Sequence, residues 1–385
     1  MNTKKMSSYI LPLGVLGLLL FLLTATVFHL ACGEEAFLKT EPSGLMDGSL
    51  QKEWDAWFAE HFFGRSTAVS AHNQINYSIF GDASGKWICG KERWLFSMGQ
   101  VENYLQMEGE IPGEAEYDAY AKKVARMQAA LAEAGKDFAY ILTPNKVEIY
   151  PEKLPWYARA ILGREVVEGE GSHARLVEAF NRNGVHYYDT TKDIVQMKSE
   201  AGFDVFARTG HHWTFTACAK EMNSIFQGIS PVTPNISYPQ VNVVGITDEL
   251  CTYDQDILNA QKVWFGHNRD IAYQSPLIAY PEISDTDVYW FGTSYGALFT
   301  IALYQGNEAR AFNRLTFQQY FTGRYIFDGE GISAEEFTQE NTPEDIGVME
   351  NIGKSDLVIM EQQADSGIYP THVKFVDYVN ACLGG

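Results

Sequence analysis

The residues best suited to chemistry are a serine between two glycines and a pair of adjacent histidines. Ser294 lies in the segment GTSYG (292–296), which follows the apolar run VYWF and precedes a helical pattern over Ala297–Tyr304. A serine on such a strand-to-helix turn projects its hydroxyl from a sheet edge, where helix amides can bind an oxyanion. The segment therefore predicts a nucleophile for acyl transfer, and the alternative is a turn serine that only caps the helix.

A serine hydroxyl is inert near neutral pH unless a base accepts its proton, and two histidines are candidates. His212, in the segment TGHHWT (209–214), precedes the serine. His372 follows the serine, with Asp365 between them, which is the Ser–Asp–His order of α/β-hydrolases. The two histidines imply different enzymes, and the residues alone leave both open.

Strands alternate with helices over most of the chain, which predicts the fold class. Short apolar runs are separated by amphipathic helices such as the one over Glu114–Ala134, and these runs are Phe138–Leu142, Val185–Tyr188, Val288–Phe291 and Leu357–Met360. This alternation is typical of an α/β fold with a largely parallel central sheet covered by helices on both faces. Ligands of such sheets bind beyond the carboxyl ends of the strands. That rule gathers five polar residues along one edge, namely Asn145, Lys146, Asp189, Ser294 and Glu361.

The N-terminal segment predicts a membrane anchor. Lys4 and Lys5 precede the apolar run Tyr9–Ala31, whose 23 residues exceed a signal-peptide core and match a transmembrane helix. Positive charge before the run favours a cytoplasmic N-terminus. We therefore expect a signal anchor over 1–32, a linker and lead-in helix over 33–85, and an extracytoplasmic domain over 86–385. A cleaved signal peptide and a lipoprotein site at Cys32 are the alternatives.

Composition excludes some partners and cofactors. The chain has 29 Lys and Arg against 49 Asp and Glu, a formal charge of −20, so binding to nucleic acid or to anionic lipid headgroups is disfavoured. None of the five cysteines lies in a C-x-x-C motif, and no H-E-x-x-H motif occurs. We therefore predict no metal site and no cofactor.

Five short motifs together resemble a known family. They are WDAWFAEHFFGRS (54–66), GKERWLF (90–96), TPNKVEIYPEKLP (143–155), GHHWT (210–214) and GTSYG. In this order they resemble the SGNH-hydrolase-like proteins of the alginate O-acetyltransferase AlgJ/AlgX type and the related bacterial DHHW family. The similarity runs from Trp54 to Glu361. It implies a three-layer α/β/α SGNH-hydrolase-like domain.

The resemblance also assigns roles in the site. It makes Ser294 the nucleophile and His212 the general base, with Trp213 packed beside the base. Asn145 would support the oxyanion, together with amides of the serine turn at Gly292 and Tyr295.

The family's aspartate falls at position 210, where this chain has Gly210. In serine proteases that acid orients the imidazole and stabilises the imidazolium. Three explanations remain open. Another carboxylate such as Asp189 or Asp204 reaches His212; a Ser–His dyad works with His211 or a backbone carbonyl as orienter; or the site is degenerate and only binds.

The function that the resemblance implies is O-acetyl transfer to, or acetyl-ester hydrolysis on, an exopolysaccharide or cell-wall glycan. The expected partner is a membrane-bound O-acyltransferase (MBOAT) that supplies acetyl groups. The alternative is a catalytically silent, glycan-binding scaffold subunit of an acetylation complex. Tyr320, Arg324 and Tyr325, which follow the serine helix, are expected in a solvated loop, with glycan contact as the alternative.

Overall fold

The structure is a computed structural model. It describes residues 17, 20, 24, 49, 52, 55–56, 64–83, 86–105, 112–158, 171–200, 202–250, 252–268, 273–304, 310–338 and 341–384. The predicted membrane span Tyr9–Ala31 lies almost wholly outside these residues. Among the residues described, none of the helices combines the length and the apolar character needed to cross a bilayer.

The chain divides into two compact units. One comprises residues 1–80 with 261–265, and the other comprises residues 81–260 with 266–385. In the first unit, helix α4 (Arg65–Ile75) continues into a π-helical turn, η1 (Asn76–Phe80). Residues 65–80 of the lead-in segment are therefore helical. All residues of the site discussed below belong to the second unit.

The second unit is built on a seven-stranded sheet with the order β11-β10-β9-β8-β12-β4-β5. In that order the strands are Gly331–Glu336, Gly323–Asp328, Phe312–Gln319, Ser284–Gly292, Leu357–Gln363, Asp137–Thr143 and Tyr187–Asp189. From β9 to β5 each neighbouring pair is parallel, whereas β10 pairs antiparallel with both β9 and β11. The sheet is mixed, and the prediction of a largely parallel sheet is corrected.

The antiparallel part exists because short turns, not crossover helices, join β9, β10 and β11. Residues 320–322 and 329–330 are too few for a crossover, so the chain must reverse direction. Tyr320 in the first turn has φ 49°, and Gly331 after the second has φ 134°. This hairpin also corrects the expected solvated loop, because Arg324 and Tyr325 lie within β10 and Arg324 is buried.

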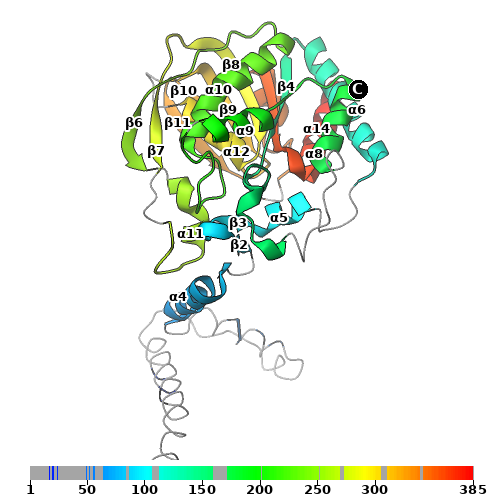
Figure 1. Ribbon diagram of the computed structural model, residues 1–385. Helices are drawn as coiled ribbons and strands as arrows, with labels where there is room; N and C mark the ends of the chain where they lie inside the picture. Colours follow the sequence, from blue (N-terminus) through cyan, green and yellow to red (C-terminus); the bar gives the residue numbers. More distant parts are fainter. Residues whose placement is uncertain are drawn as a thin grey trace, which may run out of the picture. The chain divides into compact units, whose positions relative to one another are not determined.

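Two hydrophobic clusters, one on each face of the sheet, give the domain three layers. Alternate residues of a strand enter different clusters: Ile141 and Trp290 join one, and Tyr140 and Phe291 join the other. The first face packs against α9 (Thr191–Glu200), α10 (Phe215–Ile229) and α12 (Ser294–Leu303). The second packs against α6 (Glu114–Glu133), α8 (Ser172–Asn183) and α14 (Pro370–Leu383), as Figure 1 shows. The three-layer α/β/α arrangement agrees with the sequence analysis.

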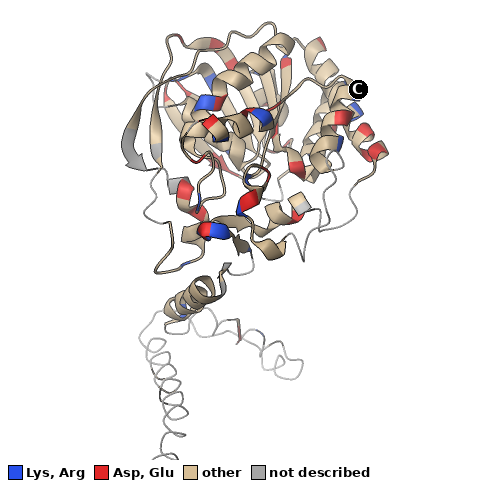
Figure 2. Cartoon of the chain, in the orientation of Figure 1, with Lys and Arg blue, Asp and Glu red and all other residues tan. Residues whose placement is uncertain are grey.

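Smaller elements surround this core. A three-stranded sheet contains β1 (Asp82–Ala83), β2 (Trp87–Cys89) and β3 (Leu95–Ser97), and β6 (Asn242–Leu250) pairs with β7 (Gln274–Ala279). The short helices are α5 (Met98–Leu105), α7 (Lys146–Ile149), α11 (Asp256–Ala260) and α13 (Val348–Gly353). Charged residues of both signs lie mostly on helices and loops, whereas the central strands are mostly uncharged (Figure 2).

Candidate active site

The serine turn connects β8 to α12 and is held by a buried carboxylate. Thr293 caps the helix, its Oγ1 accepting a hydrogen bond from the Tyr295 amide at 3.0 Å. Below the turn, Glu361 Oε2 accepts hydrogen bonds from the amides of Thr293 (2.8 Å) and Gly296 (3.1 Å). A Cβ at position 292 or 296 would lie only 2.7 or 2.8 Å from that oxygen, so both positions need glycine. The turn leaves Ser294 partly exposed at the start of α12.

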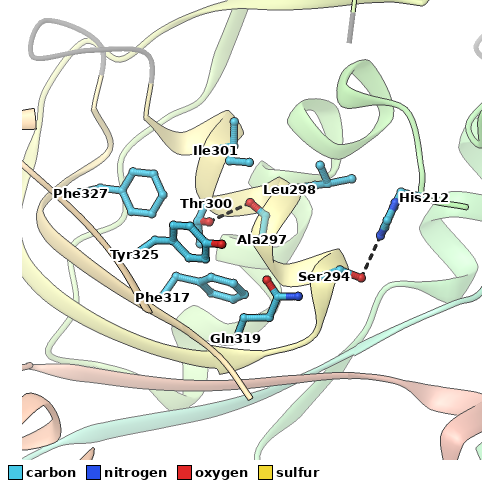
Figure 3. Close-up of a pocket in the computed structure, with 10 residues that line it drawn as sticks. All are labelled: His212, Ser294, Ala297, Leu298, Thr300, Ile301, Phe317, Gln319, Tyr325 and Phe327. Atoms are coloured by element: carbon cyan, nitrogen blue, oxygen red, sulfur yellow. Dashed lines mark hydrogen bonds between the residues drawn. The ribbon is translucent and has the colours of Figure 1, made fainter. Parts of the chain in front are cut away.

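His212 contacts the serine hydroxyl directly. Its Nε2 lies 2.8 Å from Ser294 Oγ, although the two residues are 82 positions apart in the chain (Figure 3). Its Nδ1 lies 3.1 Å from Asp256 Oδ2. These distances fit a serine–histidine–aspartate triad. In this triad His212 Nδ1 donates a hydrogen bond to the carboxylate and Nε2 accepts one from the serine hydroxyl.

Asp256 is fixed by contacts that leave one oxygen for His212. It is the first residue of α11, and its Oδ1 accepts hydrogen bonds from the amides of His211 (2.8 Å) and Ile257 (2.7 Å). Burial alone would raise the pKa of Asp256, but hydrogen bonds from His212 and the His211 amide lower it below its ordinary value. The carboxylate is therefore ionised near neutral pH and oriented toward Nδ1.

Lys146 holds the loop that carries the two histidines. Its fully buried Nζ donates to the carbonyls of Leu95 (2.7 Å), Ala207 (2.5 Å), Arg208 (3.1 Å) and Gly210 (2.9 Å). Burial lowers the pKa of Lys146, whereas the carboxylates of Asp256 and Asp204 act to raise it. The four accepting carbonyl oxygens also favour the ammonium form, which has three N–H donors. The lysine thus ties β3 to the turn immediately before His212.

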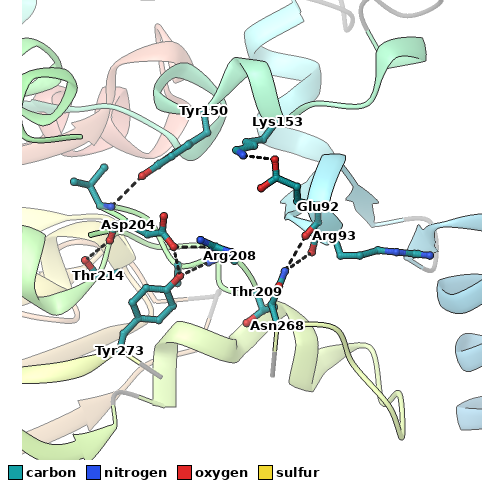
Figure 4. Close-up of polar contacts among 12 residues, drawn as sticks. Glu92, Arg93, Tyr150, Lys153, Asp204, Arg208, Thr209, Thr214, Asn268 and Tyr273 are labelled. Atoms are coloured by element: carbon teal, nitrogen blue, oxygen red, sulfur yellow. Dashed lines mark hydrogen bonds and ion pairs between the residues drawn. The ribbon is translucent and has the colours of Figure 1, made fainter. Parts of the chain in front are cut away.

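Asp204 supports the same loop but does not orient His212. Its Oδ2 accepts hydrogen bonds from Arg208 Nε (2.8 Å) and the Tyr273 hydroxyl (2.9 Å), and its carbonyl accepts one from Thr214 Oγ1 (Figure 4). Because its described side-chain contacts are with these two partners, the prediction that Asp204 orients His212 is corrected. Asp256, 52 positions further along the chain, takes that place.

Asp189 likewise pairs with a different histidine. Its Oδ2 lies 2.8 Å from His173 Nε2, and His173 Nδ1 lies 3.2 Å from Glu148 Oε1. Burial would lower the pKa of His173, but the two carboxylates raise it to about 10. The contacts of Asp189 therefore form an ion-pair cluster of their own, and the prediction that it orients His212 is also corrected.

The predicted oxyanion residues have structural contacts instead. The Asn145 carboxamide donates to Asp365 and accepts from the Glu148 amide at 2.9 Å, which caps α7. The Tyr295 hydroxyl donates to the His211 carbonyl at 2.8 Å and accepts from Gln100 Nε2 at 2.9 Å. The Asn145 side chain does not line the cavity at Ser294, so its expected role is corrected. The Tyr295 amide, which was expected to bind the oxyanion, instead donates to Thr293 Oγ1 at 3.0 Å, and the role of the Gly292 amide stays a prediction.

Aromatic packing fixes the base from the other side. The Tyr295 ring lies 5.1 Å from the His212 ring, and Trp213 is fully buried with its ring 4.4 Å from that of Phe299. The neighbouring His211 ring meets His212 edge-on at 5.0 Å. Burial and the nearby His212 lower the pKa of His211 to about 3, so His211 stays neutral and is not a second base.

His372 lies on the wrong face of the sheet to act as the base. It is a fully buried residue of α14, and its Nε2 donates to the Glu361 carbonyl at 2.8 Å. Burial lowers its pKa to about 4. Because α14 covers the face opposite α12, the Ser–Asp–His alternative with His372 is contradicted.

A cavity of about 150 Å³ opens at Ser294 and His212. Its remaining walls come from α12 and from strands β9 and β10: Ala297, Leu298, Thr300, Ile301, Phe317, Gln319, Tyr325 and Phe327. Figure 3 shows Ser294 and His212 at one end and the aromatic side chains at the other. No grouping of three or more His, Cys, Asp or Glu side chains suited to a metal ion occurs within the part of the chain that the structure describes.

Asp256 is the functional candidate that sequence analysis missed. It stands in the segment TYDQDILNA (252–260), where an aspartate opens a short apolar helix. An acidic residue at a helix start is usually explained as a helix cap. Nothing in its spacing from His212 indicates that the two meet, since that contact depends on how the loop after β6 folds back.

The sequence of this chain is similar to those of proteins described as AlgX and AlgJ. A family model described as "SGNH hydrolase-like domain, acetyltransferase AlgX" matches residues 88–243, which include His212 and end before Ser294. The probable alginate O-acetylase AlgJ of Azotobacter vinelandii is 24% identical over 187 residues, which are 47% of this chain and 43% of that protein. The chain thus spans less than half the length of the curated relatives that it matches.

Solved structures give distant likenesses. The O-acetyltransferase domain of Pseudomonas putida AlgJ covers 76% of this chain and 98% of its own length, at 14% identity and a TM-score of 0.46. A DHHW family protein from Eubacterium siraeum covers 68% and 88%, at 8% identity and a TM-score of 0.38. The resemblance that the motifs indicated is confirmed by the family-model and sequence matches: the chain is similar to SGNH-hydrolase-like proteins of the AlgJ/AlgX type.

Proposed function

We propose that this protein is a serine-dependent O-acetyltransferase or acetylesterase that acts on hydroxyl groups of a polysaccharide. The observation that carries the proposal is the pair of contacts made by His212, 2.8 Å to Ser294 Oγ and 3.1 Å to Asp256 Oδ2. A hydroxyl, a base and an ionised acid in this order are what acyl transfer through a covalent ester requires.

The reaction proceeds in two steps, acylation of Ser294 and then transfer of the acetyl group to the acceptor. Ser294 Oγ attacks the carbonyl carbon of an acetyl ester while His212 Nε2 takes the hydroxyl proton. The tetrahedral intermediate expels the leaving alcohol, which receives that proton from His212, and acetyl-Ser294 remains. A sugar hydroxyl or a water molecule then attacks the ester, gives its proton to His212, and releases Ser294 when the proton returns to Oγ.

Two groups are placed to stabilise the oxyanion of the intermediate. The Ser294 amide lies in the first turn of α12, where the helix dipole favours negative charge. The Gln319 side chain lines the cavity beside Ser294, and its carboxamide nitrogen is drawn on the side that faces the serine (Figure 3). Removing one such donor from an enzyme costs about 10²–10³ in turnover.

The polysaccharide acceptor and the membrane location are part of the proposal. The matched relatives carry the description probable alginate O-acetylase, which supports a glycan hydroxyl as acceptor. The apolar run Tyr9–Ala31 behind Lys4 and Lys5 supports a single-pass anchor with the domain on the extracytoplasmic side. A membrane-bound O-acyltransferase would then supply the acetyl groups, since the site would be separated from cytoplasmic thioesters.

The alternative of a silent binding subunit rested on Gly210, where the family has aspartate. Asp256 supplies a carboxylate to His212 Nδ1. This contact favours an active enzyme over a degenerate one.

The proposal is tested by ester hydrolysis with the full-length chain. Wild type should hydrolyse p-nitrophenyl acetate, and Ser294→Ala should reduce kcat by at least about 10³. Ser333→Ala, on the exposed strand β11, is the matched control and should keep the wild-type rate. Equal rates in wild type and Ser294→Ala would eliminate Ser294 as the nucleophile.

A further inference from the structure

The cavity at Ser294 lies between helix α12 and one face of the β9–β10 hairpin. Phe317 and Tyr325 are paired across the two strands, and their rings lie 6.4 Å apart with planes inclined by 26°. Gln319 and Phe327 each lie two residues further along one of these strands, so their side chains share the same face. The hairpin therefore presents a row of aromatic side chains to the cavity, with a carboxamide at the end near Ser294 (Figure 3).

The Tyr325 hydroxyl is available to a ligand in this cavity. Figure 3 shows it directed toward the Gln319 side chain and away from Phe327. Gly323 stands opposite Gln319, and Tyr325 Oη lies only 3.7 Å from the position that a Cβ of Gly323 would take. Within the part of the chain that the structure describes, no residue forms a hydrogen bond with the Tyr325 hydroxyl. A tyrosine hydroxyl in a cavity usually has such a partner, so a bound molecule is expected to supply it.

Tyr325 is one of the three residues after the serine helix for which glycan contact was the alternative. The other two do not line the cavity. Arg324 is buried and donates to Glu335 at 2.9 Å. The Tyr320 ring packs 5.6 Å from that of Tyr369. Of the three, Tyr325 is therefore the one placed to contact a substrate at Ser294.

The cavity has the size and the lining that a sugar ring requires. An acetyl group would fill only the part next to Ser294, whereas about 150 Å³ is the size of an engineered cavity that holds benzene, a six-membered ring. The C–H groups of a sugar gain from burial against aromatic walls, and its hydroxyls need hydrogen-bond partners. Tyr325 supplies one partner. Thr300 supplies another, because its hydroxyl donates to the Ala297 carbonyl at 2.8 Å and can still accept.

The charge of the lining restricts how a sugar could bind. The described residues that line the cavity include no Lys, Arg, Asp or Glu. A carboxylate enclosed there would lose its hydration without gaining a cation. Any charged substituent of the sugar must therefore point out of the cavity.

Resting on the proposed function, we infer that this cavity is the subsite for the sugar unit that receives or gives up the acetyl group, and that Tyr325 is a sugar-binding residue. The C–H groups of the ring would pack on Phe317, and the Tyr325 hydroxyl would form a hydrogen bond with one sugar hydroxyl. Another sugar hydroxyl would then lie at Ser294 and His212, where the base takes its proton.

The first test measures acetyl transfer by the full-length chain from p-nitrophenyl acetate to methyl glycosides of glucopyranose, mannopyranose and galactopyranose. The readout is the ratio of acetylated glycoside to free acetate. Tyr325→Phe removes only the hydroxyl, so this ratio should fall about fivefold, the effect of one lost hydrogen bond.

The matched control is Tyr187→Phe, the same change on β5 at the other edge of the sheet, which should keep the wild-type ratio. An unchanged ratio in Tyr325→Phe, with ester cleavage still dependent on Ser294, would overturn the inference and leave the proposed function intact.

A binding measurement separates the subsite from the chemistry. With Ser294→Ala, isothermal titration calorimetry should detect binding of at least one of the three glycosides, and adding Tyr325→Phe should weaken it about fivefold. This result is expected whether or not Ser294 is the nucleophile. Equal affinity with and without the Tyr325 hydroxyl, or no binding of any of the glycosides, would overturn the inference.

A filling variant shows whether the ring enters the cavity. Ala297 lies one turn after Ser294 and faces the cavity, so Ala297→Leu places three further carbon atoms where the sugar would lie. In the Ser294→Ala background it should weaken glycoside binding about tenfold or more. Ala119→Leu, an exposed change on α6, should leave the affinity unchanged. Unchanged affinity in Ala297→Leu would overturn the inference, because the sugar would then bind elsewhere.

Discussion

Asp256 Oδ2 lies 3.1 Å from His212 Nδ1, and Asp256 Oδ1 is fully engaged by the amides of His211 and Ile257. This division of the two oxygens makes Asp256→Asn informative. The Asn oxygen must face the two amides, so its NH₂ group would point at Nδ1 and drive the ring proton to Nε2. His212 could then no longer accept the proton of Ser294, and we expect kcat to fall about 10²–10⁴-fold.

The matched control is Asp254→Asn, two residues earlier. Burial and the neighbouring Asp256 raise the pKa of Asp254 to about 8, so this side chain is mostly protonated at pH 7 and an amide resembles it closely. We expect its kcat for p-nitrophenyl acetate to stay within about threefold of wild type. A loss in Asp254→Asn equal to that in Asp256→Asn would mean that the segment, not the carboxylate, matters.

Lys146→Met removes the ammonium that satisfies the carbonyls of Leu95, Ala207, Arg208 and Gly210. Buried carbonyls without donors are costly, so we expect the free energy of unfolding to drop by about 3 kcal/mol and kcat to fall at least tenfold. Urea denaturation and ester hydrolysis measure the two effects. Lys122→Met, an exposed change on α6, should alter neither quantity; wild-type stability in Lys146→Met would refute the anchoring role.

Glu221 on α10 makes stability fall as pH rises. Burial and the nearby Asp193 raise its pKa from 4.5 to about 9, so between these values the unfolded chain releases a proton that the folded chain retains. The folded state therefore loses about 1 kcal/mol per pH unit from this group. Glu221→Gln removes the dependence, and its stability relative to wild type should increase from pH 5 to pH 8.

Urea denaturation at several pH values checks this slope. Glu330→Gln, an exposed residue in the turn after β10, is the control and should follow the wild-type curve. If the stability difference between Glu221→Gln and wild type is the same at pH 5 and pH 8, Glu221 is ionised in the folded protein and the expectation is wrong.

Local patterns predicted most elements because each is set by short-range chemistry. The helix over Glu114–Ala134 is found at Glu114–Glu133, and Gly135 follows it with φ 74°. The apolar runs at Phe138–Leu142 and Leu357–Met360 are neighbouring parallel strands. The serine turn has the strand-before, helix-after context that its glycines indicated.

Long-range pairing explains what sequence analysis could not predict. Strand β10 contains the buried Arg324, which binds Gln318 on β9 and Glu335 on β11, and such a residue suggests a loop until its partners are known. The choice among Asp189, Asp204 and Asp256 likewise depends on which loops pack together. Each of the first two is bound by a nearer partner, His173 or Arg208.

The mixed sheet separates two tasks between two parts of the chain. Ser294 is the first residue of α12, His212 lies in the loop before α10 and Asp256 is the first residue of α11. Phe317, Tyr325 and Phe327 lie instead on the β9–β10 hairpin. We therefore expect substitutions in the hairpin to change the size of the cavity at Ser294 without displacing the proton-transfer groups. Relatives that share the serine and histidine can therefore differ in the substrates that their cavities bind. Substitutions intended to change substrate preference should begin in the hairpin.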